Sequence, residues 1–289
     1  MIELGRLALG TAPLGGLYEA VAEETAHAVV ERAWELGVRY FDTAPYYGSG
    51  LAERRLGAAV RHRPREDLVI STKIGRLLRP GATNWDGAYF DFSFDGALRS
   101  LDESLRRLGL DQVDVVLVHD PDDHYDEALT GAFPALRRLR DEGVVRAIGV
   151  GMNQTELLCR FAREADPDCF LVAGRYTVLD RSAARKLLPL CEERGIAVIA
   201  GGVFNSGVLA GGDRFDYETA PPEVIARVAS LRETCEGLNV PLSAAAVQFP
   251  ARHPAVVSVL VGCRTPREME EDVRLFELDL PSELWAKLG

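Results

Sequence analysis

The chain contains 289 residues, and its 33 Lys and Arg against 44 Asp and Glu give a formal net charge of −11. An acidic chain lacks the basic surface that binds nucleic acid or an anionic membrane, so we expect neither as a partner. A composition of 47% hydrophobic and 27% charged residues is typical of a globular protein and excludes disorder for the chain as a whole. The length fits two ordinary domains or one α/β barrel.

The sequence shows no signal for secretion, membrane insertion or metal binding. Residues 1–4 do not begin a basic region followed by an apolar stretch, and no apolar run is long enough to span a membrane. The five cysteines lack CxxC spacing, and the five histidines are scattered without an HExxH motif. We expect a cytoplasmic protein with reduced core cysteines and no metal. We also expect a monomer or weak homo-oligomer.

Short apolar runs alternate along the chain with longer amphipathic ones, which is the pattern of repeated βα units. Strands are predicted at residues 6–10, 40–42, 68–73, 113–118, 147–151, 169–173, 197–201 and 257–261. Helices are predicted at residues 23–36, 50–60, 93–108, 125–142, 154–165, 183–194, 222–237 and 267–276, with an additional helix at 243–252.

Eight βα units in an undivided chain predict the α/β class and a (β/α)8 TIM barrel, as a single domain over residues 1–289. An open doubly wound sheet fits less well. The dinucleotide fingerprint GxGxxG is also absent, as are the P-loop and the GxSxG elbow.

Four chemically active side chains stand at the ends of consecutive predicted strands. Asp42 ends the second strand and is followed by Tyr47, Lys73 ends the third, and His119 follows the fourth. Side chains at the carboxyl ends of barrel strands face the active-site mouth. We therefore expect an acid, a phenol, an amine and an imidazole to converge there.

These four side chains form a set suited to proton transfer. The Lys73 ammonium is expected to lower the pKa of Tyr47 from its usual value of about 10, while Asp42 holds Lys73 charged. His119 is expected to hydrogen-bond a substrate oxygen beside Tyr47. Such a set suits reduction of a carbonyl, or oxidation of an alcohol, when a cofactor exchanges hydride.

Each of the four residues also has a structural interpretation when taken alone. Asp42 could cap a turn, Lys73 could be solvated, and Tyr47 could pack on Tyr46 at the rim. His119 could be a capped loop histidine. Their convergence on adjacent strand ends favours the catalytic interpretation.

The motifs around these residues resemble those of the aldo-keto reductase family. Residues 37–48, with aspartate and tyrosine five positions apart, resemble its first signature. Residues 70–73 resemble its strand-three lysine motif, and residues 118–121 resemble its strand-four histidine motif. Residues 207–211 and 261–264 resemble its later cofactor-binding stretches. The likeness covers nearly the whole chain in the same order.

The resemblance implies a (β/α)8 barrel that binds NADP(H) or NAD(H) in extended form without a Rossmann fold. It implies Tyr47 as the general acid/base, Lys73 and Asp42 as the pair that tunes it, and His119 as the residue that orients the substrate. The residues implied at the cofactor are Thr11, Ala12, Asp42, Asn153, Gly202, Val203, Phe204, Ser206, Gly262, Arg264, Arg267, Glu268 and Asp272.

The chain departs from the family pattern where the nicotinamide would bind. Ala173 stands where a carboxamide-binding Gln is common, and Gly201 stands where many members have an aromatic ring on the nicotinamide. Phe204 is a candidate replacement for that ring.

The choice between NAD and NADP stays open. Arg264 and Arg267 are suited to an adenosine 2′-phosphate, whereas the Glu268 carboxylate would repel it and could accept a ribose hydroxyl. All three could also be solvated charges at a helix start.

Residues 149–154 and 200–210 most resemble the sugar dehydrogenase branch of the family, which covers L-fucose (D-threo-aldose), L-galactose and pyridoxal. The resemblance implies oxidation of the C1 hydroxyl of an aldose to a lactone. Trp85 is expected to bind the substrate together with Tyr47 and His119, in a loop (77–92) that also contains Asn84 and Tyr89.

Two alternative functions stay open. One is an NADPH-dependent reductase of aldehydes or ketones. The other is a non-catalytic, nucleotide-sensing regulatory subunit, which the complete set of four residues disfavours.

Overall fold

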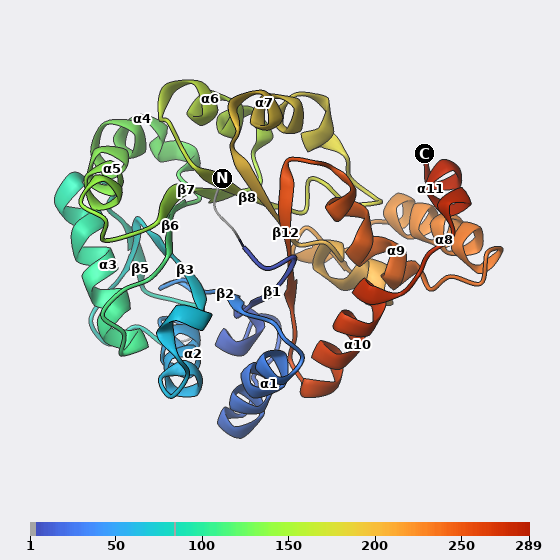
Figure 1. The fold of residues 1–289 in the computed structure, drawn as a ribbon, viewed down its shortest axis with the longest axis horizontal. Coiled ribbons are helices and arrows are strands. Elements are labelled where there is room, and N and C mark those ends of the chain that lie inside the picture. The colour runs from blue at the N-terminus through green and yellow to red at the C-terminus, as the bar shows by residue number, and fades with distance from the viewer. Residues whose placement is uncertain (1–3, 84) are drawn as a thin grey trace.

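The computed structural model describes residues 4–83 and 85–289. Within them, eight parallel strands close into a barrel surrounded by helices, as Figure 1 shows. The barrel strands are β1 (Leu7–Gly10), β2 (Tyr40–Asp42), β3 (Val69–Ile74), β6 (Val115–His119), β7 (Ala147–Met152), β8 (Cys169–Ala173), β9 (Ala197–Gly201) and β12 (Val256–Gly262). Each strand pairs with the next in chain order, and β12 pairs with β1. The predicted TIM barrel is confirmed; Asn84 and residues 1–3 lie outside the described residues.

The barrel strands divide their side chains between two packed cores, because successive residues of a strand point to opposite faces. The barrel interior is filled by one set of buried residues: Ala8, Tyr40, Val115, Leu117, Ala147, Cys169, Leu171, Ala197, Ile199 and Leu260. The alternate residues pack outward against the helices in a larger cluster that includes Leu9, Phe41 and Ile70. This alternation fixes which strand-end residues face the barrel axis.

The surrounding helices are α1 (Glu23–Glu35), α2 (Leu51–Val60), α3 (Phe94–Leu108), α5 (Phe133–Asp141), α6 (Thr155–Glu164), α7 (Leu187–Arg194), α8 (Pro222–Glu236), α9 (Leu242–Gln248) and α10 (Pro266–Glu277). Helix α3 shows why such segments are helical. The Ser93 side chain caps it by accepting a hydrogen bond from the Gly96 amide at 3.0 Å, and Gly109 ends it at a φ of 65°. Its buried Leu101 and Leu108 lie on one face.

The predicted helix at 125–142 is interrupted. A three-residue α4 (Tyr125–Glu127) is followed by a π-helical turn, Ala128–Ala132, before α5 begins. Pro134 lacks the amide hydrogen that the preceding turn would use, so a regular helical ladder cannot continue through it. A proline likewise accompanies the 3-10 turn Phe249–Arg252 that ends the predicted helix at 243–252.

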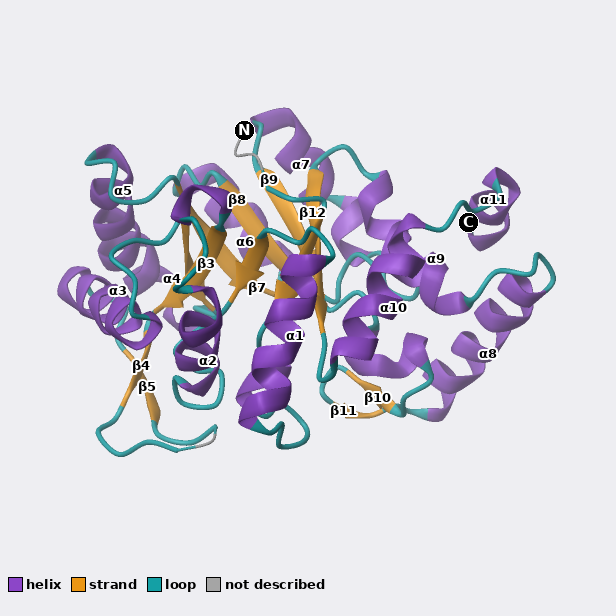
Figure 2. Ribbon diagram, turned by 60° about the horizontal axis from the view of Figure 1, so that its bottom comes forward, coloured by secondary structure: helices purple, strands orange, loops and turns teal. Residues whose placement is uncertain are grey.

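Two hairpins and a last helix were not predicted. The first hairpin, of β4 (Arg76–Leu78) and β5 (Ala88–Phe90), overlaps the predicted loop 77–92, and the second joins β10 (Arg214–Phe215) to β11 (Glu218–Thr219). The chain ends in α11 (Ser282–Leu288). Figure 2 shows the two hairpins on the same side of the molecule. Among the described residues, no helix is long and apolar enough to cross a membrane.

Candidate active site

The last inward-facing residue of each strand forms the floor of the barrel mouth. The register places Gly10 beside Asp42, Lys73 beside Leu117, and His119 beside Gly151. On β2, β3 and β6 these end residues are Asp42, Lys73 and His119. Across the barrel, β8 and β9 end in Ala173 and Gly201. The half of the mouth at β2, β3 and β6 therefore carries ionisable side chains, and the half at β8 and β9 carries only small residues.

Asp42 and Lys73 form a buried ion pair. Their Oδ2 and Nζ atoms are 2.7 Å apart, and both residues are 1% exposed. Lys73 Nζ also donates to the Thr43 carbonyl at 2.8 Å, and the Ser71 hydroxyl donates to Asp42 Oδ1 at 2.7 Å. Burial alone would lower the pKa of Lys73, but Asp42 and Tyr47 together raise it, so Lys73 is an ammonium ion.

Tyr47 lies in the turn after β2, with the Lys73 ammonium 4.6 Å from the centre of its ring. Burial raises the pKa of Tyr47, Lys73 lowers it, and Asp42 raises it again. Lys73 therefore lowers the pKa of Tyr47, as expected. The expectation that this pKa falls below its usual value is wrong, because the loss of solvent around Tyr47 outweighs the charge of Lys73. Tyr47 is a neutral phenol at neutral pH, suited to donating a proton.

His119 faces Tyr47 across the mouth, with the two ring centres 5.8 Å apart at 87°. It is 6% exposed, and no described residue hydrogen-bonds its Nδ1. Burial lowers its pKa well below the usual range, and the charges of Arg76 and Lys73 lower it further. The imidazole is therefore neutral and can donate a hydrogen bond to a substrate oxygen.

Tyr47, Lys73 and His119 line a cavity of 880 Å³ at the mouth. It also takes in the predicted residues Ala12, Trp85 and Asn153. Trp85 packs against both tyrosines, 5.8 Å from Tyr47 and 5.2 Å from Tyr46 between ring centres. The structure thus brings Tyr47, Lys73, His119 and Trp85 together on one cavity, whereas Asp42 lies outside its lining and is paired with Lys73.

Sequence reasoning missed several residues that line the cavity, among them Arg76, Asp120 and Tyr217. Arg76 lies three positions after Lys73, and Asp120 lies one position after His119. A charged side chain just beyond a strand end is the signal that could have identified both. Tyr217 comes from the unpredicted β10–β11 hairpin. No sequence signal identifies it.

The other predicted cofactor residues lie outside the lining of this cavity. The hydroxyl of Thr11 donates to the Asp42 carbonyl at 3.0 Å. In the loop after β9, which holds Gly202, Val203, Phe204 and Ser206, the Ser206 hydroxyl accepts a hydrogen bond from the Tyr217 amide. This loop follows a strand that pairs with β12. The predicted residues 262–272 follow β12, so both segments lie at neighbouring strand ends.

The start of α10 carries charges that neutralise one another. The guanidinium of Arg264 donates to Glu268 Oε1 at 2.8 Å and to Glu19 Oε1 at 2.6 Å. Glu268 also accepts from the Arg264 amide, and its own amide donates to the Thr265 side chain. Arg267 is exposed and forms no ion pair within residues 4–83 and 85–289. Glu268 therefore both caps this helix and holds Arg264 in an ion pair.

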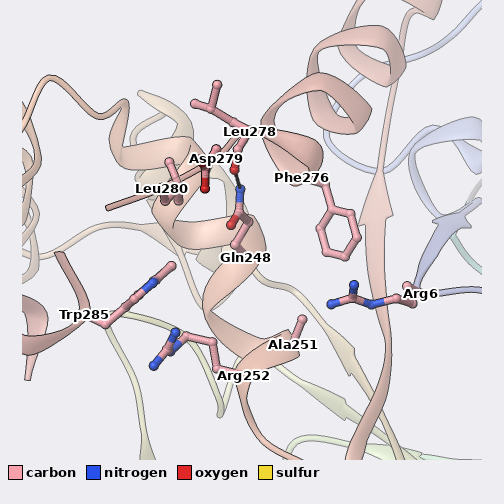
Figure 3. Close-up of a pocket in the computed structure, with 9 residues that line it drawn as sticks. All are labelled: Arg6, Gln248, Ala251, Arg252, Phe276, Leu278, Asp279, Leu280 and Trp285. Atoms are coloured by element: carbon pink, nitrogen blue, oxygen red, sulfur yellow. Dashed lines mark hydrogen bonds between the residues drawn. The ribbon is translucent and has the colours of Figure 1, made fainter. Parts of the chain in front are cut away.

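A second cavity, of 210 Å³, lies at the opposite end of the barrel, where β1 begins. Figure 3 shows its lining, in which Arg6 lies beside Phe276 and Arg252 beside Trp285. It contains none of the four predicted catalytic residues. Three of the four, Tyr47, Lys73 and His119, line the 880 Å³ cavity instead.

Residues 6–289 match the aldo/keto reductase family. The chain belongs to the aldo-keto reductase family. It is 44% identical to pyridoxal 4-dehydrogenase from Microbacterium luteolum and 43% identical to D-threo-aldose 1-dehydrogenase from a Pseudomonas species, in each case over 98% of this chain and 92% of the relative. An aldo-keto reductase structure from Bacillus halodurans superposes with a TM-score of 0.83 at 25% identity, covering 99% of this chain and 91% of that one.

This aldo-keto reductase is an NAD(P)-dependent oxidoreductase, and its cavity fits a nicotinamide. Gly151 and Ala173 line the cavity and carry at most a methyl group. This part of the cavity wall, which Lys73 shares, therefore holds no large side chain that would exclude a planar ring. Asn153 lines the same space and offers an amide to the carboxamide. The bound ring would supply a hydride donor or acceptor.

Beneath the start of α10, Asp272 is buried against a thiol. Its Oδ2 lies 3.4 Å from Cys263 Sγ, and the residue is 8% exposed. Burial raises the pKa of Asp272 to about 7. The folded protein therefore holds this proton more tightly than the unfolded chain does.

Asp272→Asn is expected to stabilise this aldo-keto reductase at pH 8 and not at pH 4. A carboxyl whose pKa is raised on folding costs stability as pH rises from the unfolded value, about 3.9, through about 7. The variant should therefore gain about 2–4 kcal/mol at pH 8. Urea unfolding at both pH values measures this, with the exposed Asp111→Asn as a control. A change of equal size at both pH values would contradict the assignment.

Proposed function

We propose that this aldo-keto reductase oxidises the C1 hydroxyl of a cyclic aldose, of the L-fucose or D-threo-aldose kind, to a lactone. The observation that carries the proposal is the convergence of Tyr47, Lys73 and His119 on one cavity whose rim is charged. Arg76, Asp120, Asp122 and Asp123 line this rim. A charged and polar wall suits a polyhydroxylated substrate better than an apolar aldehyde. The likeness to D-threo-aldose 1-dehydrogenase supports the same substrate class.

The proposed roles follow from the positions of the four side chains. His119, neutral in its buried position, donates to the C1 oxygen and holds it beside Tyr47. Tyr47, as the phenolate, takes the hydroxyl proton. A bound nicotinamide would supply the acceptor for the C1 hydride. Lys73 stabilises the phenolate from 4.6 Å, and Asp42 keeps Lys73 in place. The lactone carbonyl forms as the O–H and C–H bonds break.

Pyridoxal is a second candidate substrate, because the relative at 44% identity is a pyridoxal 4-dehydrogenase. Pyridoxal closes to a cyclic hemiacetal, so the same groups would perform the same oxidation. Trp85 and Tyr46 at the rim suit its aromatic ring as well as a sugar face.

A substrate panel with both nucleotides tests the proposal. We expect aldoses, L-fucose among them, to be oxidised with NAD⁺ or NADP⁺ at higher kcat/KM than simple aldehydes are reduced. Good reduction of simple aldehydes with no aldose or pyridoxal oxidised would favour the carbonyl reductase. Tight nucleotide binding without turnover on any substrate would favour the regulatory subunit.

Glu268→Gln is expected to raise kcat/KM for NADP⁺ relative to NAD⁺ by about tenfold. The glutamine retains the cap on α10 but removes a carboxylate that repels a 2′-phosphate and occupies Arg264. Steady-state kinetics with both nucleotides measure the ratio. Glu277→Gln, at the far end of the same helix, is the matched control. An unchanged ratio would place the 2′ position of the ribose away from Glu268.

We also infer a small-molecule enzyme of the cytoplasm that acts as a monomer or weak homo-oligomer. All five cysteines are buried and unpaired, which supports a reducing compartment. The net charge of −11 supports the absence of nucleic acid among its partners.

A further inference from the structure

An ion pair lies immediately beyond the catalytic residues, on the rim of the cavity. Arg76 opens β4, three residues after Lys73, and Asp120 directly follows His119. Arg76 Nη2 donates to Asp120 Oδ2 at 2.8 Å. Because β3 and β6 are neighbouring strands, the pair bridges two adjacent strand ends.

The backbone holds both partners in place. Gly75 has a φ of 96°, and a Cβ there would lie 2.0 Å from the Phe92 ring, so only glycine allows the turn that leads to Arg76. Asp120 has a φ of 41°, and its amide donates to the Gly151 carbonyl at 3.0 Å. Non-glycine residues seldom adopt this conformation, which indicates that Asp120 is held in position at some cost.

The guanidinium of Arg76 is oriented by aromatic rings. Its central carbon lies 4.8 Å from the centre of the Tyr46 ring and 5.4 Å from that of Phe90. Contacts of this kind fix the plane of a guanidinium and leave its edge for hydrogen bonds. The edge of the Arg76 guanidinium donates its hydrogen bond to Asp120.

The ion pair leaves hydrogen-bonding capacity unused. Within the described part of the chain, no hydrogen bond reaches Asp120 Oδ1, and Arg76 Nε has no partner. The buried Oδ1 of Asp122 and the indole Nε1 of Trp85, both on the cavity lining, also lack described partners. Buried polar atoms without partners are costly, and hydroxyl groups both donate and accept. The buried atoms lie beneath the cavity surface, so the acceptor that this wall offers to a ligand hydroxyl is Asp120 Oδ1.

The distance to His119 places the pair next to the reacting carbon. Asp120 Oδ2 lies 3.6 Å from His119 Nε2. In the proposed reaction His119 holds the C1 oxygen, and the oxygens of a vicinal diol lie about one hydrogen-bond length apart. A C2 hydroxyl group would therefore meet Asp120 while C1 faces Tyr47.

We propose that Arg76 and Asp120 bind the C2 hydroxyl of the sugar and thereby select polyhydroxylated substrates over simple aldehydes. This inference rests on the proposed function. Asp120 accepts the hydroxyl hydrogen, and Arg76 fixes the carboxylate and donates to the hydroxyl oxygen. A site built to bond a substrate hydroxyl discriminates strongly against the analogue that lacks it.

The test compares three substrates in four proteins. Oxidation of L-fucose, oxidation of its 2-deoxy analogue and reduction of benzaldehyde are measured for the wild type, Asp120→Asn, Arg76→Lys and Asp126→Asn. Arg76→Lys retains the charge without the planar guanidinium. Asp126→Asn removes the same charge as Asp120→Asn from an exposed position outside the cavity lining. Thermal unfolding shows that each variant is folded.

We expect Asp120→Asn to raise KM for L-fucose by about 10- to 100-fold with little change in kcat. The preference for L-fucose over its 2-deoxy analogue should collapse toward unity, and benzaldehyde reduction should change much less than L-fucose oxidation does. Arg76→Lys should lose part of the same preference, and Asp126→Asn should match the wild type. An equal loss on all three substrates, or an unaltered preference in Asp120→Asn, would overturn the role of this pair.

The wild-type protein alone tests the proposed function, through its oxidation of aldoses. If the wild type oxidises no aldose, that function fails, and quenching of tryptophan fluorescence then measures L-fucose binding directly. Weaker L-fucose binding by Asp120→Asn than by the wild type would still support the hydroxyl site. Absence of L-fucose binding by the wild type would overturn it.

Discussion

Tyr47→Phe is expected to lower kcat by at least about 10²–10⁴-fold, the usual contribution of general acid–base catalysis. The phenol is the only group of the four at the mouth that the proposal assigns to carry the proton. Nucleotide affinity should stay the same, because the change removes a single oxygen. Trp85, 5.8 Å from the Tyr47 ring, reports nucleotide binding through its fluorescence.

Tyr46→Phe is the matched control, because Tyr46 lines the same cavity and packs on the same tryptophan. It should lose much less activity than Tyr47→Phe. The pH profile adds a second measurement. Oxidation needs the phenolate, and burial raises the pKa of Tyr47, so the oxidation rate should rise from neutral toward alkaline pH. Activity retained by Tyr47→Phe would remove Tyr47 from its proposed role.

Lys73→Met is expected to abolish turnover and to destabilise the protein by about 3–5 kcal/mol. The ammonium of Lys73 is the partner of a carboxylate that is 1% exposed, and removing one member of a buried pair leaves an uncompensated charge. Urea unfolding at pH 7 gives the change in free energy, and steady-state kinetics give the activity.

The double variant Asp42→Asn/Lys73→Met separates the loss of stability from the loss of turnover. It removes both charges and leaves Ser71 a polar partner at position 42, so stability should recover substantially. Activity should not recover, because the phenolate still lacks its cation. Recovery of turnover in the double variant would show that Lys73 acts only through stability.

The barrel and the convergence of its strand-end side chains were predictable because both depend on short-range regularities. Buried parallel strands appear as short apolar runs, and the period of two along a strand decides which end residue faces the axis. Asp42, Lys73 and His119 are therefore found by locating the strand ends. The resemblance to a known family then assigned their order and expected roles.

The features that could not be predicted depend on contacts between segments that are distant in the sequence. Arg264 is paired with Glu19, 245 positions away, so the sequence could not show that this arginine is already occupied. The net pKa of Tyr47 depends on how completely the folded chain excludes solvent from it. The Arg76–Asp120 contact similarly requires the unpredicted β4–β5 hairpin to fold back over the mouth.

The most direct test of the central proposal follows the hydrogen at C1 of the sugar. L-Fucose deuterated at C1 is incubated with the protein and NAD⁺ or NADP⁺, and the products are identified by nuclear magnetic resonance. The account predicts a lactone and one deuterium on the reduced nicotinamide for each sugar consumed. Sugar recovered with its deuterium intact, or a reduced nicotinamide without deuterium, would contradict it.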